Sequence, residues 1–382
     1  MIWDVAVIGL GAMGSAISYY LAQQGARVLG LDRFVPPHNF GSSHGQTRVI
    51  REAYFEHPAY VPLLQTAYNN WESLEAVSGL SLLHKTGGLM LGKVDSTLIQ
   101  GSRESAERYG IAHEILSQNE IMSRYPAFSL PADMVGLHEQ RAGLLYPEKC
   151  ISTYLDLARR AGAEIVTNQP LLNWQREGSG FVLQTAAAEL RCEKLVIASG
   201  AWTGSLLPEM ALPLQVTRQV LYWFETPDPN PFAIGHFPIF LLEYGPEEFL
   251  YGFPDQGEGF KIAQHLPGRP QDPELLSQSV EPTEIEQMTD FLMRFFKGMG
   301  STRSSEYRPK LSKTAVCMYT NTPDGHFLID RHPEHDSLWL VSPCSGHGFK
   351  FASALGDVLA RAVLANRPAP ELDFFSLARL QV

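Results

Sequence analysis

The sequence predicts an α/β protein in which a domain with a largely parallel sheet is interleaved with a mixed-sheet α+β domain. Apolar strands of the buried parallel type occur at the N-terminus and return near residues 195–202 and 338–341. Between about residues 215 and 314 the strands are instead rich in aromatic and β-branched side chains and are separated by Pro, Gly and Asp turns. We therefore expect residues 1–85, 145–214 and 315–382 to form the first domain, and residues 86–144 and 215–314 to form the second.

Residues 5–32, VAVIGLGAMGSAISYYLAQQGARVLGLD, indicate what the first domain binds. They read as a strand, a glycine-rich turn, a helix and a second strand that ends in Asp32. Gly9 permits a tight turn, Gly11 lets the backbone approach a pyrophosphate, and Gly14 lets helix and strand pack closely. The helix N-terminus attracts phosphates, and Asp32 is placed to accept a hydrogen bond from a ribose hydroxyl. This predicts a Rossmann-type dinucleotide site, without separating NAD from FAD.

Periodicity and turn signals place the remaining elements. Apolar residues at three- and four-residue spacing predict a helix over about residues 57–78, and Gly162 ends a predicted helix over residues 151–161. Short strands are expected near residues 88–92 and 164–167, with two further strand-like runs before residue 195. Aromatic strands are predicted within residues 219–225, 238–244, 249–253 and 260–265, and a strand over residues 315–319. Helices follow over residues 282–297 and 348–365.

Composition narrows the class of protein. The chain has 382 residues, 45% of them hydrophobic and 19% charged, which is typical of a globular protein with a sizeable core. A net charge of −11 without any basic tract argues against nucleic-acid binding. No apolar run approaches ~20 residues and the N-terminus enters a strand at once, so we expect neither a membrane span nor a leader peptide. The four cysteines form no C-x-x-C pair and no metal-like cluster, which favours a reducing, cytoplasmic location and no metal.

Four further segments carry a family resemblance. They are GSSHGQTRVIR (41–51), VIASGAW (196–202), AVCMYT (315–320) and SGHGFKFAS (345–353). Together with the N-terminal motif, they resemble the monomeric sarcosine oxidase and N-methyltryptophan oxidase family from residue 2 to about 365. The resemblance implies a monomeric flavoprotein whose FAD is attached by a thioether to Cys317, although a buried core thiol is the ordinary interpretation of such a cysteine. For Cys344 we expect core packing.

The resemblance also implies how the cofactor is surrounded. Arg48 would lie near the flavin ring and stabilise its negative charge when reduced, although an ion pair with Glu52 would be an equally ordinary use of a loop arginine. Further cofactor contacts are expected from Arg33, His44, Thr47, Gly200, Trp202, Gly346, His347, Gly348 and Lys350. Gln46 departs from the acidic residue expected at its position in the family.

Lys350 stands out on physical grounds, because a cation in the first turn of a helix is disfavoured by the helix dipole. The alternative is a solvated lysine at a helix end. In the family the matching lysine, together with the arginine at Arg51, holds the substrate carboxylate. Lys261 and His265 share one face of a predicted strand. The resemblance assigns Lys261 to oxygen activation and His265 to the substrate, and a structural histidine remains the alternative for His265.

The rest of the pocket is expected to consist of Tyr251 and Tyr319 as aromatic walls, with Leu241 and Tyr244 near the substrate side chain; plain core packing is the alternative. The implied reaction moves a hydride equivalent from the carbon next to nitrogen to the flavin, releases an imine, and lets O₂ reoxidise the flavin to give H₂O₂. A flavin dehydrogenase with another acceptor, or an NAD-dependent dehydrogenase, are the rival enzymes. Sarcosine, a bulkier N-methyl amino acid, a cyclic imino acid or a glycated amino acid all remain candidate substrates.

Overall fold

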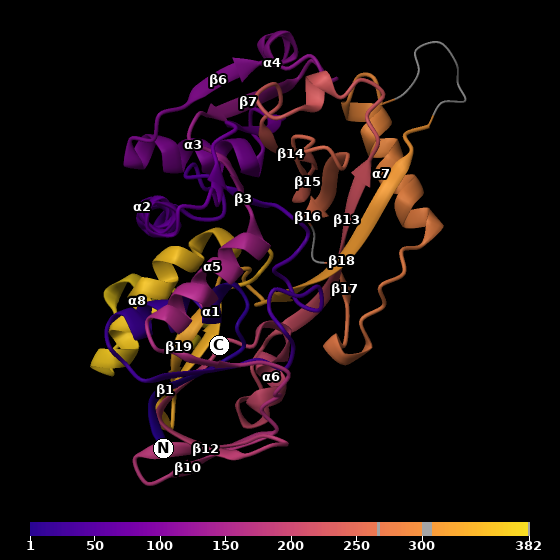
Figure 1. The fold of residues 1–382 in the computed structure, drawn as a ribbon. Helices are drawn as coiled ribbons and strands as arrows, with labels where there is room; N and C mark the ends of the chain where they lie inside the picture. Colours follow the sequence, from indigo (N-terminus) through magenta and orange to yellow (C-terminus); the bar gives the residue numbers. More distant parts are fainter. Residues whose placement is uncertain (266–267, 300–307, 381–382) are drawn as a thin grey trace.

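The computed structural model describes residues 1–265, 268–299 and 308–380, which form two halves, each built on one large sheet (Figure 1). In the first half parallel pairing joins β20, β12, β1, β2 and β9 in that order. Antiparallel neighbours extend this sheet at β11 and β19. The strands are β1 (Ile2–Ile8), β2 (Val28–Leu31), β9 (Glu164–Val166), β10 (Asn173–Glu177), β11 (Gly180–Gln184), β12 (Glu189–Ile197), β19 (Leu328–His332) and β20 (His335–Ser342).

Helices cover this first sheet. Helix α1 (Ala12–Gln23) packs between α5 (Pro147–Arg160) and α8 (Ala352–Ala365), and α2 (Val61–Ser78) lies against α8. Because α1 is enclosed by these neighbours and by the sheet, nearly all of its side chains are buried. Short helices complete the connections: η1 (Pro58–Tyr60), η2 (Gly200–Trp202), α6 (Thr203–Leu206), η3 (Pro208–Met210), η6 (Phe349–Phe351), η7 (Pro370–Phe375) and η8 (Leu377–Leu380).

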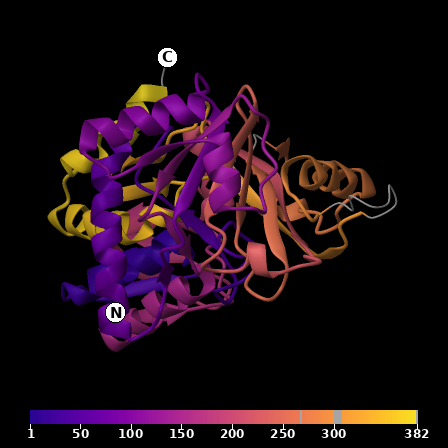
Figure 2. The ribbon, with the colours of Figure 1, turned by 90° about the horizontal axis from the view of Figure 1, so that it is seen from above.

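The second half is a mixed sheet in the order β17-β13-β16-β15-β14-β5-β7-β6, with β18 joined to the other side of β13. Alternate side chains enter different cores: Leu89 and Leu91 pack in the cluster that contains α7, whereas Met90 packs in the cluster that contains α3. Figure 2 shows α7 at the outer edge of this half, away from the C-terminal helices. The elements are β5 (Gly88–Lys93), α3 (Thr97–Tyr109), β6 (Glu114–Ser117), α4 (Gln118–Arg124), β7 (Met134–Glu139), β13 (Gln215–Phe224), η4 (Asn230–Phe232), β14 (Ile239–Gly245), β15 (Glu248–Phe253), β16 (Phe260–His265), β17 (Arg269–Pro270), η5 (Pro273–Leu275), α7 (Pro282–Phe295) and β18 (Leu311–Asn321).

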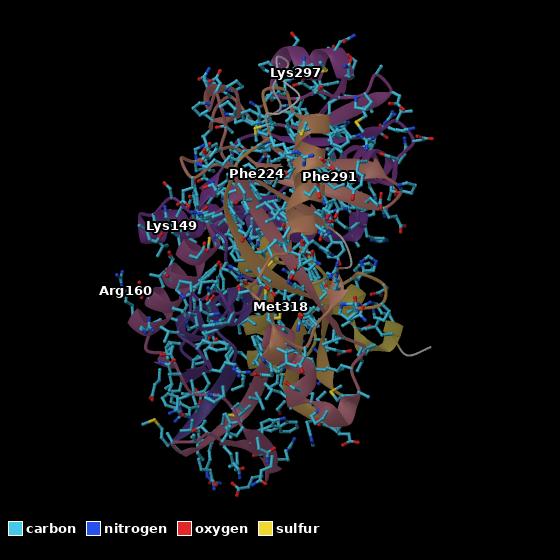
Figure 3. All side chains as sticks on the ribbon, turned by 90° about the vertical axis from the view of Figure 1, so that its right-hand side faces the viewer. Lys149, Arg160, Phe224, Phe291, Lys297 and Met318 are labelled. Carbon is cyan, nitrogen blue, oxygen red and sulfur yellow. The ribbon has the colours of Figure 1, made fainter. Side chains whose placement is uncertain are left out.

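Two features join the halves. A small sheet of β3 (Arg48–Ile50), β8 (Gly143–Leu145) and β4 (Leu83–His84) lies where the chain passes between them. The long strands β13 and β18 rise from the middle of the molecule, where Met318 is labelled, to Phe224 in the second half (Figure 3). A site at this junction therefore receives residues from both sheets.

The predicted fold class is confirmed, and the differences lie at the ends of elements and in elements that the sequence did not predict. Helix α5 begins at Pro147 rather than at residue 151, because proline suits the first turn of a helix. The strand expected to reach residue 202 ends at Ile197, where η2 begins shortly afterwards. The domain boundary expected at residue 315 cuts through β18, which pairs with β13 along its length in the second sheet. Helices α3 and α4 and strands β6, β7 and β19 were not expected. No helix in the described ranges is long and apolar enough to span a membrane.

Candidate active site

A cavity of about 580 Å³ extends from the glycine turn after β1 to the second sheet. At one end its wall contains Gly11 and Asp32, and at the other it contains Tyr251 and His265. The expected residues that line it are Gly9, Gly11, Asp32, Arg33, Arg48, Arg51, Gly200, Trp202, Leu241, Tyr251, His265, Cys317, Tyr319, Gly346, His347, Gly348 and Lys350. The fold thus gathers most of the predicted site in one place.

The three glycines of the first turn each have a steric reason. Gly9 has φ +87°, and a Cβ there would overlap the Ala198 backbone. A Cβ on Gly14 would overlap the carbonyl oxygen of Gly9, so this glycine allows helix and turn to pack together. Gly11 instead faces open space and is the N-cap of α1, whose first turn holds no acidic residue. This arrangement fits a pyrophosphate at the helix N-terminus.

Polar groups farther along this end fit the remainder of a dinucleotide. The Asp32 carboxylate accepts hydrogen bonds from the backbone N–H groups of Leu10 (2.7 Å) and Phe34 (2.8 Å), and each oxygen keeps acceptor capacity for a ribose hydroxyl. Burial raises the pKa of Asp32. The Ser342 hydroxyl, at the end of β20 in the cavity wall, has no hydrogen-bond partner within the described part of the chain. The residues present therefore fit FAD.

Two thiols lie in the cavity wall. Cys317 is buried on β18, where burial raises its pKa and the charges of Arg48 and Lys261 lower it. Cys344 is half-buried, and its Sγ accepts a hydrogen bond from Thr320 N at 3.3 Å. The expectation that Cys344 is a core residue is wrong, because the turn after β20 folds over Thr320 and brings this thiol into the cavity wall as well.

Lys261 lies behind the cavity wall. Its Nζ donates to the carbonyl oxygens of Gly45 (2.6 Å) and Thr47 (3.0 Å) and to Thr47 Oγ1 (2.9 Å). The pKa of Lys261 is lowered well below its usual value, mainly by burial and to a smaller extent by the charge of Arg48. Three of the expected site residues, Lys261, Thr47 and His44, do not line the cavity, whereas Arg48 does. These three residues therefore lie behind the wall that Arg48 helps to form.

The loop at residues 45–47, which accepts hydrogen bonds from Lys261, is also held by Glu148 and Trp223. Glu148 Oε1 accepts from Gly45 N (2.7 Å) and Gln46 N (3.0 Å). Gln46 has φ +71°, and its Oε1 accepts from Trp223 Nε1 at 3.1 Å, so the residue that departs from the family pattern has a structural role. Arg48 donates to Thr47 O and Ser42 O and not to Glu52, which pairs with Arg141.

Arg51 and Lys350 both lie close to one aromatic ring, that of Tyr54. The guanidinium carbon of Arg51 lies 4.3 Å from the Tyr54 ring centroid, and Lys350 Nζ lies 5.1 Å from it. Arg51 is 1% exposed, and its Nη2 donates to both oxygens of Glu56, at 2.7 and 2.8 Å. Lys350 lies in η6 and is 5% exposed, so the interpretation as a solvated lysine is wrong. Burial lowers its pKa to about 7.

The opposite wall comes from the second sheet. His265 Nδ1 lies 3.3 Å from the Tyr319 hydroxyl, and burial lowers the pKa of His265 to about 4, so the ring is neutral at neutral pH. Gly346, at φ +78°, lets the turn before η6 approach these rings, because a Cβ there would overlap both. Leu241 and Tyr251 complete this wall. Tyr244 lies elsewhere: it packs on Phe291 in the core beside α7, so its expected place in the pocket is wrong.

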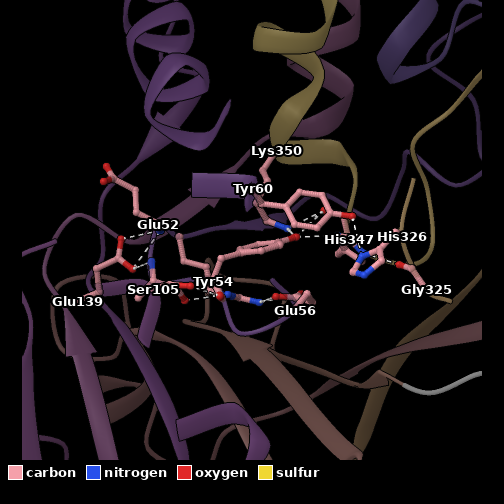
Figure 4. A network of polar contacts seen from close by, with 12 residues as sticks. Glu52, Tyr54, Glu56, Tyr60, Ser105, Glu139, Gly325, His326, His347 and Lys350 are labelled. Carbon is pink, nitrogen blue, oxygen red and sulfur yellow. Dashed lines mark hydrogen bonds and ion pairs between the residues drawn. The ribbon is translucent and has the colours of Figure 1, made fainter. Parts of the chain in front are cut away.

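Sequence reasoning missed two residues of this site, Tyr54 and Glu56 (Figure 4): Glu56 lines the cavity, and Tyr54 lies beside Arg51 and Lys350. An aromatic residue and an acid shortly after an arginine are common in loops, so no local signal marked them. Only the fold shows that the loop after β3 turns back and brings Glu56 to Arg51.

Comparison with known proteins identifies the family of this chain. The sequence model of the family described as FAD dependent oxidoreductase matches residues 4–362. Monomeric sarcosine oxidase of Streptomyces avermitilis is 39% identical over 99% of this chain and 98% of its own length. N-methyl-L-tryptophan oxidase of Citrobacter koseri is 34% identical over 99% of both chains. The structure of NikD, an amino acid oxidase, matches with a TM-score of 0.84 at 20% identity over 98% of this chain and 97% of that one. The chain therefore belongs to the FAD dependent oxidoreductase family, among the relatives of monomeric sarcosine oxidase and N-methyl-L-tryptophan oxidase.

Proposed function

We propose that the protein is an oxidase of secondary amino acids, N-methylated or cyclic, that uses covalently bound FAD and O₂. One observation carries the proposal: two buried cations, Arg51 and Lys350, lie in the wall of a cavity whose other wall contains Leu241, Tyr251 and Tyr319. The cations would bind the carboxylate of an amino acid substrate, and the apolar wall would pack against the hydrocarbon part beside its amine. The names of the relatives, sarcosine and N-methyl-L-tryptophan oxidases, point to the same substrate class.

The chain has residues to hold FAD at three points. The N-terminus of α1 at Gly11 would take the pyrophosphate and Asp32 a ribose hydroxyl, and Cys317 would supply the thioether to the flavin ring. FAD, when bound, supplies the oxidation of the C–N bond and passes the electrons to O₂. The charges of Arg48 and Lys261, both close to Cys317, would stabilise negative charge in this part of the cavity.

The remaining residues orient the substrate. Arg51 would bind the carboxylate through its guanidinium, whose Nη2 donates to Glu56 and whose Nε has no hydrogen-bond partner among the described residues. Lys350, whose Nζ lies 5.1 Å from the same Tyr54 ring, adds a second positive charge. The neutral ring of His265 is able to accept a hydrogen bond from the substrate amine. Lys261, whose three hydrogen bonds go to the loop at Gly45 and Thr47, would act on oxygen through its charge.

Two measurements test the proposal. The purified protein should be yellow, and the flavin should stay with the chain after acid denaturation in the wild type but not in Cys317→Ser. A peroxide-coupled assay should then find turnover with sarcosine or another secondary amino acid and much less with the matching primary amino acid. A colourless protein that FAD does not reconstitute would contradict the cofactor. Reduction of the flavin by substrate without reoxidation in air would instead indicate a dehydrogenase.

A further inference from the structure

Tyr54 is a fully buried phenol whose hydroxyl lies between a lysine and a histidine. Its oxygen is 2.6 Å from His347 Nδ1 and 3.4 Å from Lys350 Nζ (Figure 4). Lys350 Nζ also donates to the His347 carbonyl oxygen at 2.7 Å. Two of the three ammonium protons of Lys350 are therefore directed toward two neighbouring residues, Tyr54 and His347.

The far side of His347 fixes the direction of these hydrogen bonds. His347 Nε2 lies 3.0 Å from the carbonyl oxygen of Gly325, and since a carbonyl oxygen only accepts, Nε2 carries a proton. Burial lowers the pKa of His347 to about 3, so the ring is neutral and Nδ1 is an acceptor. The Tyr54 hydroxyl therefore donates to Nδ1 and turns its lone pairs toward Lys350. The hydrogen bonds run in one direction, from Lys350 through Tyr54 and His347 to Gly325.

We propose that Tyr54 and His347 are positioning residues that hold the Lys350 ammonium in the orientation required to bind a carboxylate. This inference rests on the proposed function, because it assumes that Lys350 binds the substrate carboxylate. A lysine side chain has several rotatable bonds and would otherwise adopt many orientations. The Tyr54 hydroxyl donates its proton to His347, so only its lone pairs face Lys350. A hydrogen-bond acceptor at this position stabilises the charged form of the lysine.

A neighbouring residue pair provides a matched control. Tyr60 is also fully buried in this aromatic cluster, and its hydroxyl lies 3.2 Å from His326 Nδ1. Its ring is 5.1 Å from that of Tyr54. Its hydroxyl contacts His326, and within the described part of the chain no hydrogen bond joins it to Lys350. Tyr60→Phe removes the same atom as Tyr54→Phe from nearly the same place, without touching the lysine.

The test is acetate binding to the purified holoenzyme, measured by calorimetry. Tyr54→Phe should weaken acetate about tenfold, as expected when a charged group loses a buried hydrogen-bond partner, and Tyr60→Phe should change it less than about twofold. In a Lys350→Met background, Tyr54→Phe should have no further effect, because its influence passes through the lysine. His347→Leu should change affinity in the same direction by a smaller factor, and it decides the question if Tyr54→Phe does not fold.

The pH profile separates positioning from general loss of structure. The groups facing Lys350 are Arg51, Tyr54 and Glu56 on the segment after β3, His347 before η6, and His265 on β16. The ammonium binds acetate, so affinity falls as pH rises through the lysine pKa, and Tyr54→Phe should move this fall to lower pH. Unchanged affinity and an unchanged profile in Tyr54→Phe, or an equal loss in the Lys350→Met background, would overturn the inference. If Lys350→Met itself binds acetate normally, the carboxylate role in the proposed function is wrong instead.

Discussion

The ion pair between Arg51 and Glu56 predicts that the protein's own carboxylate competes with the carboxylate of the substrate. Glu56 lines the same cavity as Arg51, and both of its oxygens accept from Arg51 Nη2. An incoming carboxylate that uses this guanidinium must share it with Glu56 or displace it. We therefore predict that Glu56→Gln, which keeps the size of the side chain and removes its charge, binds acetate more tightly than the wild type.

The strength of the competing pair follows from the pKa of Glu56. Burial alone would raise this pKa, but the positive groups around Glu56, of which Arg51 contributes most, together outweigh burial and lower the pKa from 4.5 to about 2. At 1.36 kcal/mol per unit this corresponds to about 3 kcal/mol. Because the folded-state pKa is depressed, the stabilisation is present above pH 4.5 and is lost as the pH falls toward 2. Glu56→Gln should lower the free energy of unfolding at neutral pH by about this amount, and the difference should shrink between about pH 4.5 and 2.

Acetate affinity should rise by between about tenfold and a hundredfold in Glu56→Gln, since part of that free energy no longer opposes binding. Calorimetric titration measures the affinity, and thermal unfolding with added acetate should show that the ligand restores most of the lost stability. Glu52→Gln is the matched control: Glu52 lies on the same segment, pairs with Arg141, and should leave acetate binding unchanged. Equal or weaker acetate binding in Glu56→Gln would refute competition at Arg51.

Three further changes test the other cations and the thiol. Arg51→Ala should weaken acetate by about 2–4 kcal/mol, the range for truncating a buried charge-assisted pair, and calorimetry that finds normal affinity would place the carboxylate elsewhere. Lys261→Met should slow reoxidation by O₂ in stopped-flow far more than anaerobic reduction, and should lower stability by about 1–3 kcal/mol because Gly45 O and Thr47 lose their donor. Equal slowing of both half-reactions would argue against its role with oxygen. Cys317→Ser should fold and bind FAD reversibly, whereas flavin that survives denaturation in this variant would point to Cys344.

Local sequence patterns predicted the dinucleotide-binding half well, because the structure of its glycine turn depends on residues that are close together in the sequence. The turn at Gly9, Gly11 and Gly14 needs small residues for steric reasons that depend on a few neighbouring atoms. The ends of elements were less accurate. Strand β18 continues across the expected boundary at residue 315 because its pairing with β13, about a hundred residues earlier, decides where it begins. Such non-local pairing leaves no mark in a short window of sequence.

The same division between local and non-local information applies to the site. Motif resemblance identified Arg48, Arg51, Lys261 and Lys350 by residue type, but it did not reveal their partners. Lys261 is bonded to a loop more than two hundred residues away in the sequence. The contact between Tyr54 and His347 likewise joins residues that only the fold brings together. Buried charged groups depend on partners that are distant in the sequence, so the sequence motifs could not predict what surrounds these groups.

The segment from His44 to Glu56 contains both arginines of the proposed site, and polar side chains from three elements hold its backbone. Glu148 on α5 accepts from Gly45 N, and Lys261 on β16 donates to the carbonyl groups of the same turn. Glu139, at the end of β7, accepts from the N–H groups of residues 52 and 53 (Figure 4), and burial raises its pKa to about 7. Since α5 packs with the first half and β7 and β16 belong to the second sheet, the segment is fixed to both. Neither half alone would therefore set the distance between the arginines of this segment and Cys317, and a change that loosens one half against the other should impair the site before it unfolds either sheet.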